Sequence, residues 1–224
     1  GKKLPVKASR KVPGRVYVKT SSGVKEIDLK NKRDGTIYDT EEFQTAAFPY
    51  TVTAGSEINF FRDIDGKDMV DTNVTTARRL ATGEKMKVTW IGMYFPQATG
   101  NHGNLSDANG VSDIVKLIEN AYLELKVNKQ LVAEGPLWQF PSGYGIYGSS
   151  TAANTAIVTN GLPATKLQYK LRCPQEIFAD HDIAGKIIFH NRSWLGAGFT
   201  AGQPVFTGPL TFKMVLGGIV WGVN

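Results

Sequence analysis

Few residues of this 224-residue chain have the types and spacing that an active site requires. Two of its three histidines, His181 and His190, lie close in sequence, and His181 is flanked by Asp180 and Asp182. A carboxylate beside an imidazole can orient and charge it, and two such histidines would suit a cupin-like metalloenzyme. Adjacent strand residues face opposite ways, however, so a solvated turn is the simpler interpretation of the triplet.

The other reactive groups also have plainer interpretations. Cys173 is the only cysteine, which excludes an internal disulfide. Apart from His181, which is near in sequence, nothing supports a catalytic thiol, so Cys173 is interpreted as a small buried side chain. Residues 62–71 (RDIDGKDMVD) hold four aspartates, and clustered oxygen ligands suit calcium. Their spacing is not that of an EF-hand, so we expect a solvated turn, with a calcium site as the alternative.

Local motifs for catalysis are missing from the sequence. It has no nucleophile elbow, zinc-protease helix, phosphate-binding loop or dinucleotide fingerprint. We therefore expect no enzyme activity, no catalytic residue, no metal, no cofactor and no small-molecule substrate.

One glycine-rich segment, 135–150 (GPLWQFPSGYGIYGSS), concentrates aromatic residues: Trp138, Phe140, Tyr144 and Tyr147. Alternation would place Trp138 and Phe140 in a core, and tyrosines suit subunit interfaces because they add area at low entropic cost. Aromatic rings between glycines also stack on sugars. The segment therefore predicts interface or core residues, with a carbohydrate-binding jelly-roll module, secreted or on a cell surface, as the alternative function.

Positive charge is concentrated at the start of the chain. Residues 1–33 hold eleven Lys and Arg against two acids, whereas the whole chain has a net charge of +6, so the remainder is slightly acidic. Residues 1–14 contain two prolines and few large apolar side chains, which predicts a basic arm that does not fold alone. Its contact residues for nucleic acid phosphates or an anionic membrane are predicted to be Lys2, Lys3, Lys7, Arg10, Lys11 and Arg15. A solvated tail, or an arm that reaches a neighbouring subunit, is the alternative.

The elements expected along residues 15–224 are mostly short strands within one domain. Strict alternation marks strands at 85–95, 122–127, 165–172 and 210–216, and further strands are expected at 15–19, 24–29, 48–53, 57–61, 130–133 and 186–190. One helix of about ten residues follows Ser112 as its N-cap, with apolar residues at Ile114 and Ile118. About eight to ten strands with one inserted helix predict an all-β fold, a jelly roll or other two-sheet β-sandwich.

The stretch Thr72-Asn73-Val74 through Glu84, followed by the strand from Met86 to Phe95, resembles capsid proteins of tailless, membrane-containing icosahedral bacteriophages. Residues 111–137, with the sequence EGPL at their end, are similar to another part of those proteins. The resemblance covers about a third of the chain. It implies a single jelly roll that self-assembles into a shell with copies of itself and with other capsid proteins, located in the virion, and it transfers no catalytic residue.

Overall fold

Strands make up most of the computed structural model. It describes residues 15–20, 23–28, 32–43, 50–95, 108–141, 147–152, 155–159, 166, 168–190, 199–200 and 203–222. The elements, in chain order, are β1 (Arg15–Thr20), β2 (Gly23–Asp28), β3 (Lys32–Phe43), β4 (Tyr50–Thr51), β5 (Glu57–Phe60), β6 (Glu84–Tyr94), α1 (Ala108–Asn120), β7 (Ala121–Val127), β8 (Gln130–Pro136), the 3-10 helix η1 (Leu137–Gln139), β9 (Tyr147–Ala152), β10 (Thr155–Thr159), β11 (Tyr169–Phe178), β12 (Ile183–Phe189), β13 (Phe199–Thr200), β14 (Gln203–Phe206) and β15 (Leu210–Gly222).

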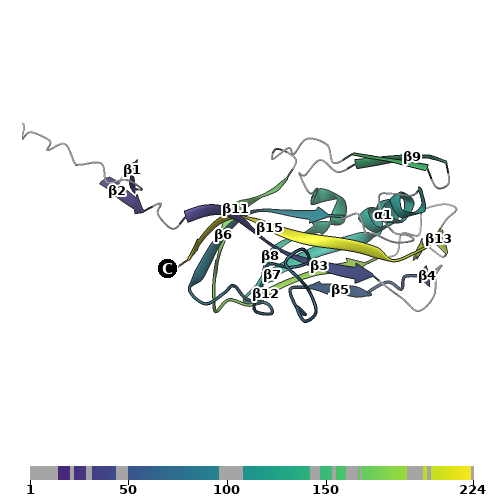
Figure 1. Ribbon diagram of the computed structural model, residues 1–224, viewed down its shortest axis with the longest axis horizontal. Helices are drawn as coiled ribbons and strands as arrows, with labels where there is room; N and C mark the ends of the chain where they lie inside the picture. The colour runs from purple at the N-terminus through teal and green to yellow at the C-terminus, as the bar shows by residue number, and fades with distance from the viewer. Residues whose placement is uncertain are drawn as a thin grey trace, which may run out of the picture.

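Eight of these strands form a sandwich of two antiparallel four-stranded sheets (Figure 1). One sheet has the order β11-β6-β15-β3 and the other β5-β12-β7-β8. The sheets meet at one side where β3 lies beside β5, and at the other side the ring of Phe140, after β8, lies 4.5 Å from that of Tyr169 in β11. The predicted all-β sandwich is confirmed.

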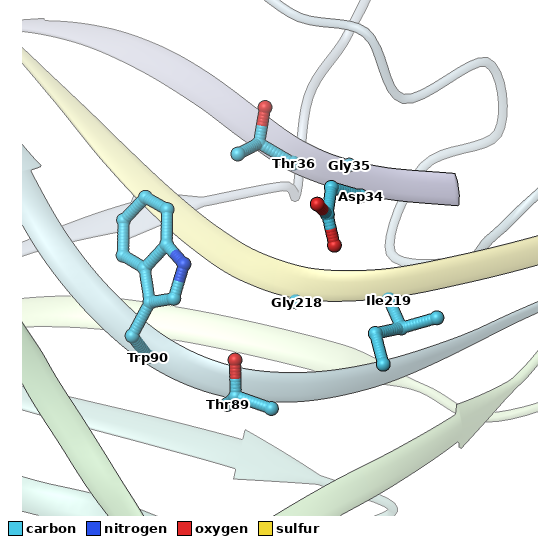
Figure 2. Close-up of a pocket in the computed structure, with 7 residues that line it drawn as sticks. All are labelled: Asp34, Gly35, Thr36, Thr89, Trp90, Gly218 and Ile219. Carbon is cyan, nitrogen blue, oxygen red and sulfur yellow. The ribbon is translucent and has the colours of Figure 1, made fainter. Parts of the chain in front are cut away.

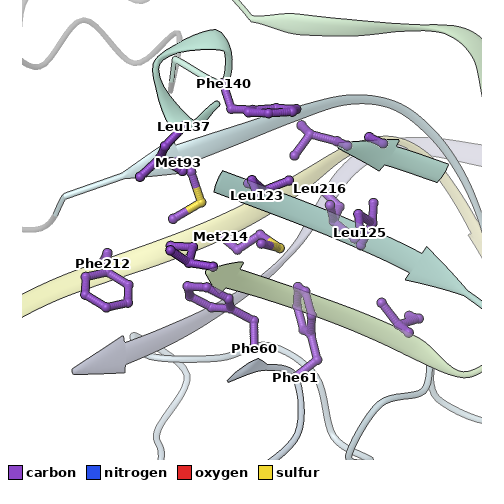
Figure 3. Close-up of a cluster of buried hydrophobic side chains, with 14 of the residues drawn as sticks. Phe60, Phe61, Met93, Leu123, Leu125, Leu137, Phe140, Phe212, Met214 and Leu216 are labelled. Carbon is purple, nitrogen blue, oxygen red and sulfur yellow. The ribbon is translucent and has the colours of Figure 1, made fainter. Parts of the chain in front are cut away.

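The core lies between the two sheets because the strands bury every second residue. β7 and β12 alternate strictly between buried and half-buried positions, which is the period that a half-buried strand dictates. Figure 3 shows the inward side chains of both sheets meeting, among them Phe60, Leu123, Phe212 and Met214. Each fully buried side chain of this size contributes roughly 1.5–3 kcal/mol through the apolar surface it removes from water.

Three smaller strand groups surround the sandwich. The hairpins β1–β2 and β9–β10 each pair internally, and β13, β14 and β4 form a three-stranded sheet. In Figure 1, the β1–β2 hairpin stands apart from the sandwich, whereas β9 lies near α1. The hairpin at 147–159 was not predicted, and the strand expected at 48–53 is only two residues long within the described part.

Helix α1 packs at one end of the sandwich against β14, β9 and η1. It begins at Ala108, so the predicted N-cap at Ser112 is wrong and Ser112 lies inside the helix. The fully buried carboxylate of Asp113 accepts hydrogen bonds from the backbone N–H and the hydroxyl of Thr207, and from Lys116. These bonds tie the helix to the segment before β15. Among the described helices, none has the length and apolarity that a membrane crossing demands.

The longest pairing in the fold was also missed by sequence patterns. No strand was expected at residues 32–43, but β3 occupies them and pairs with β15 from Lys32↔Trp221 to Phe43↔Leu210. Alternation in β3 is hidden because Asp39, a charged residue, occupies an inward position opposite Met214. Charge at a core position is rare unless it is paired.

Candidate assembly surfaces

The free edge of β3 is covered by the loop of residues 62–73. The side chain of Asn73 accepts a hydrogen bond from the backbone N–H of Tyr38 at 2.9 Å and donates one to the carbonyl of Thr36 at 2.6 Å. The hydroxyl of Thr72 donates to the carbonyl of Tyr38 at 2.9 Å. These side chains take the place of a neighbouring strand, so β3 does not present these backbone groups to a partner chain.

A buried ionic cluster holds this loop against the sandwich. Lys67 donates to Asp39 at 2.9 Å and to Glu41 at 2.7 Å. Asp39 is fully buried and also accepts the backbone N–H of Phe61, the residue after β5. The cluster therefore joins the 62–73 loop, the edge strand β3 and the end of β5.

Protonation of Glu41 is shifted by its surroundings. Burial raises the pKa of the Glu41 carboxyl to about 7, although its hydrogen bond and ion pair with Lys67 oppose the shift, and the nearby Asp39 carboxylate adds to it. The same two carboxylates raise the pKa of Lys67 despite its partial burial. Lys67 therefore stays charged at neutral pH, while Glu41 is poised to change its charge there.

Two of the four aspartates of the loop serve local turns. Asp68 accepts hydrogen bonds from the backbone N–H groups of Val70 and Asp71, and Asp63 accepts one from that of Asp65. Such bonds stabilise turns. Across the part of the chain that the structure describes, no three His, Cys, Asp or Glu side chains are grouped in a way that could hold a metal ion.

At the tip of this loop, two large apolar side chains face solvent. Met69 is 69% exposed and Val70 is 72% exposed. Their backbone carbonyls accept hydrogen bonds from Tyr38 and Lys213, which lie on the outer face of the sheet. Fixed at the backbone, the tip presents its apolar side chains on the β3/β5 side of the sandwich.

The opposite side of the sandwich exposes two more large apolar side chains, one near each end of β8. Leu131, in the edge strand β8, is 47% exposed, and Trp138, in η1 directly after β8, is 57% exposed. β8 is the last strand of its sheet and lies farthest from β5. The two pairs, which we call the tip pair (Met69 and Val70) and the β8 pair (Leu131 and Trp138), therefore lie on opposite lateral sides.

The predicted aromatic residues do not act together. Phe140 is buried and packs against Tyr169, whereas Trp138 is exposed, because η1 breaks the strand alternation between them. Tyr144 lies outside the described residues, and for Tyr147 only the backbone, at the start of β9, is described. Of the predicted arm contacts, Lys2, Lys3, Lys7, Arg10 and Lys11 lie outside the described residues, and Arg15 begins β1 without a described side chain.

The candidate chemical residues are also kept apart. His181 precedes β12 and His190 follows it, so at about 3.3 Å per residue the strand separates them by far more than a shared metal ion allows. His181 packs edge-on against Phe178, with ring centroids 4.9 Å apart. The side chain of Asp182 lies 3.9 Å from Arg78.

Cys173 is exposed on the edge strand β11, so its predicted burial is wrong. The physical reason is a register shift between Lys170 and Gln175, which carries Cys173 away from the pairing with β6.

The tip pair and Asn73 were not identified from sequence. A signal existed, because two adjacent large apolar residues inside an acidic loop are unusual. The partners of Asn73 are about 35 residues away, and no local pattern reports them.

Comparison with models of known protein families finds no match, and comparison with curated proteins finds none either.

Proposed function

We propose that this chain is a shell-forming structural subunit, a viral capsid protein of the tailless bacteriophage kind, built on a jelly roll and assembled through its lateral sides. Its topology is the first support. The first of the eight sandwich strands pairs with the last, the second with the seventh, the third with the sixth and the fourth with the fifth. One long antiparallel hairpin rolled into two sheets would produce this pairing, which supports the proposal of a jelly roll, an architecture of capsid and lectin domains.

The observation that carries the assembly proposal is the placement of the tip pair and the β8 pair on opposite lateral sides. Different apolar residues on opposite sides favour head-to-tail contacts, in which the tip pair of one copy meets one member of the β8 pair, at one end of β8, on the next. Such heterologous contacts build rings or larger arrays and do not stop at a dimer.

The sheet edges favour contacts through side chains over strand addition. Asn73 covers the edge of β3, and β5 is only four residues long. The edge strand β11 carries a register shift and Pro174, which has no N–H to donate, and β8 ends at Pro136. These are the devices by which sheet edges avoid pairing with other chains.

Inside such a shell, the basic segment would bind an anionic partner. With eleven Lys and Arg among residues 1–33, it suits the phosphates of nucleic acid or the head groups of an anionic membrane. Binding to nucleic acid would weaken steeply with salt, because released counterions drive it.

Electron microscopy and light scattering of the purified protein test the assembly. We expect particles or sheets for the wild type. A double variant in the tip pair, Met69→Ser/Val70→Ser, and a double variant in the β8 pair, Leu131→Ser/Trp138→Ser, should each stay monomeric. Mixing the two variants should give dimers only, because each supplies the one intact patch that the other lacks.

The matched control replaces two exposed residues outside both patches, Lys166→Ser/Asp180→Ser, and should assemble like the wild type. A wild-type protein that stays monomeric at high concentration would refute the shell function. Assembly by both patch variants would refute the head-to-tail contact, and dimers of either variant alone would show that a patch meets its own copy instead.

A further inference from the structure

An open groove of about 570 Å³ crosses the outer face of the β11-β6-β15-β3 sheet. Its lining comes from three neighbouring strands: Asp34, Gly35 and Thr36 of β3, Thr89 and Trp90 of β6, and Gly218 and Ile219 of β15. The groove is within the size range of small-ligand sites. It lies on a sheet face and involves neither the tip pair nor the β8 pair.

The floor of the groove is the bare backbone of Gly218 in strand β15, next to Gly217, which is buried under the ring of Trp90. A Cβ atom on Gly217 would lie 1.9 Å from the indole ring of Trp90, and one on Gly218 would lie 2.0 Å from the carbonyl oxygen of Lys87. No other residue fits either position without displacing a neighbour. The Trp90 ring therefore packs directly on Gly217, and the glycine pair fixes where the ring stands.

A bulge in β6 brings a second polar side chain to the same face. The register shifts where Gly217 pairs with Trp90 and Gly218 pairs with Val88, which leaves Thr89 as the extra residue. The Thr89 hydroxyl lies 3.3 Å from the carbonyl oxygen of Gly217 and donates to it. Bulges commonly re-aim a side chain in this way.

Polar groups from three sides converge over this floor. Figure 2 shows the Asp34 carboxylate reaching toward Gly218 from β3, the Thr89 hydroxyl facing the same space from β6, and the ring nitrogen of Trp90 on the groove side of its indole. Ile219 closes one end with an apolar side chain. An aromatic ring, a carboxylate, a hydroxyl and an exposed backbone thus share one hollow.

We infer that this groove binds an uncharged saccharide. A pyranose has apolar C–H surfaces that pack on an indole and hydroxyls that donate to a carboxylate, and hydrogen bonds to an ionised acceptor are the strong ones. Jelly rolls serve as lectins as well as capsids, so such a site is compatible with the fold.

Charge favours an uncharged saccharide over an anionic or a cationic ligand in this groove. The Asp34 carboxylate repels phosphates and acidic sugars. A cationic side chain from another polypeptide would be drawn to Trp90 and Asp34, but Lys87, whose register partner is the groove residue Ile219, adds a positive charge on the same face and disfavours it. A neutral polyol avoids both penalties.

The test is a titration of the purified full chain with methyl glucoside, methyl galactoside, methyl mannoside, maltose and cellobiose, followed by saturation-transfer NMR. At least one of these saccharides should bind detectably at concentrations up to about 10 mM. This range suits millimolar dissociation constants, which correspond to binding free energies near about −4 kcal/mol. Asp34→Asn should weaken that binding about tenfold or more, because one charge-assisted hydrogen bond is lost. Glucuronate should bind more weakly than glucose to the wild type, and the difference between the two sugars should be smaller for Asp34→Asn.

Two further variants make the result specific to the groove. Trp90→Phe should also weaken binding, whereas the matched control Trp138→Phe, at an exposed tryptophan on the β8 side, should bind like the wild type. Thermal unfolding of each variant shows whether it is folded. Asp34 is exposed, so Asp34→Asn keeps the test valid even where Trp90→Phe unfolds.

The inference is overturned if no saccharide binds, if Asp34→Asn binds as tightly as the wild type, or if glucuronate binds most tightly. It is also overturned if a peptide of residues 1–14 binds the groove and the saccharides do not. The shell function is tested separately. A protein that binds saccharide but stays monomeric would support the saccharide site and refute the assembly proposal.

Discussion

Lys67 is the residue whose replacement should destabilise the sandwich edge most. Its ammonium group lies between Asp39 at 2.9 Å and Glu41 at 2.7 Å. The variant Lys67→Met keeps the length of the side chain and removes the charge. It leaves the fully buried Asp39 carboxylate without its counter-ion, although the N–H of Phe61 still donates to it.

The expected loss follows from burial. Removing one partner of a buried ion pair costs about 3–5 kcal/mol, because the remaining charge is desolvated without compensation. The Lys67 side chain is 18% exposed, which favours the lower end, about 3 kcal/mol in the free energy of unfolding. In a chain of this size, that loss lowers Tm by roughly 6–12 °C.

Urea denaturation of wild type and variant measures the difference. The matched control is Lys126→Met, which removes a lysine 2.9 Å from Glu124 with a 40% exposed side chain, and should change stability by no more than about 1 kcal/mol. The double variant Lys67→Met/Asp39→Asn should recover part of the loss, because the uncompensated buried charge is gone. If Lys67→Met is as mild as Lys126→Met, the cluster does not hold the edge.

Two other predictions concern the same sheet. Because burial raises the pKa of Glu41 from 4.5 to about 7, the folded state binds this proton more tightly than the unfolded state; its contribution is therefore fully present below about pH 4.5 and lost as pH rises through 7. The free energy of unfolding of the wild type should therefore fall between about pH 5 and pH 8, and Glu41→Gln should reduce this fall by roughly 1–3 kcal/mol. An equal fall in the variant would contradict the raised pKa of Glu41. Gly217→Ala should cost about 1–3 kcal/mol by overpacking against Trp90 and shift the tryptophan fluorescence. Gly222→Ala, whose added Cβ would meet its nearest atom at 3.9 Å, should do neither, and equal effects of the two variants would refute the packing argument.

Much of the strand content was predictable because alternation is a local property. Residues 122–127 and 210–216 were expected as strands from their period of two, and they lie within β7 and β15. The helix was found from its apolar spacing, but its start was misplaced by five residues, since a side chain at Ser112 reports only a local preference. Strand β3 was missed where Asp39 interrupts the pattern.

The candidate surfaces were less predictable because they depend on distant partners. Nothing near Asp39 in the sequence indicates that it is buried; the reason is Lys67, 28 residues later. The exposure of Trp138 and the burial of Phe140, only two residues apart, were decided by the short turn of η1, which interrupts the strand alternation between them.

By itself, the sequence determined the kind of element and the distribution of charge: short alternating strands, one amphipathic helix and a basic start. Each depends on neighbours along the chain. Only the tertiary structure decided which strands pair, which sides expose apolar residues, that Trp90 packs on Gly217, and that Gly218 forms the floor of a groove beside it. Those outcomes depend on residues more than a hundred positions apart, whose contact no local periodicity records.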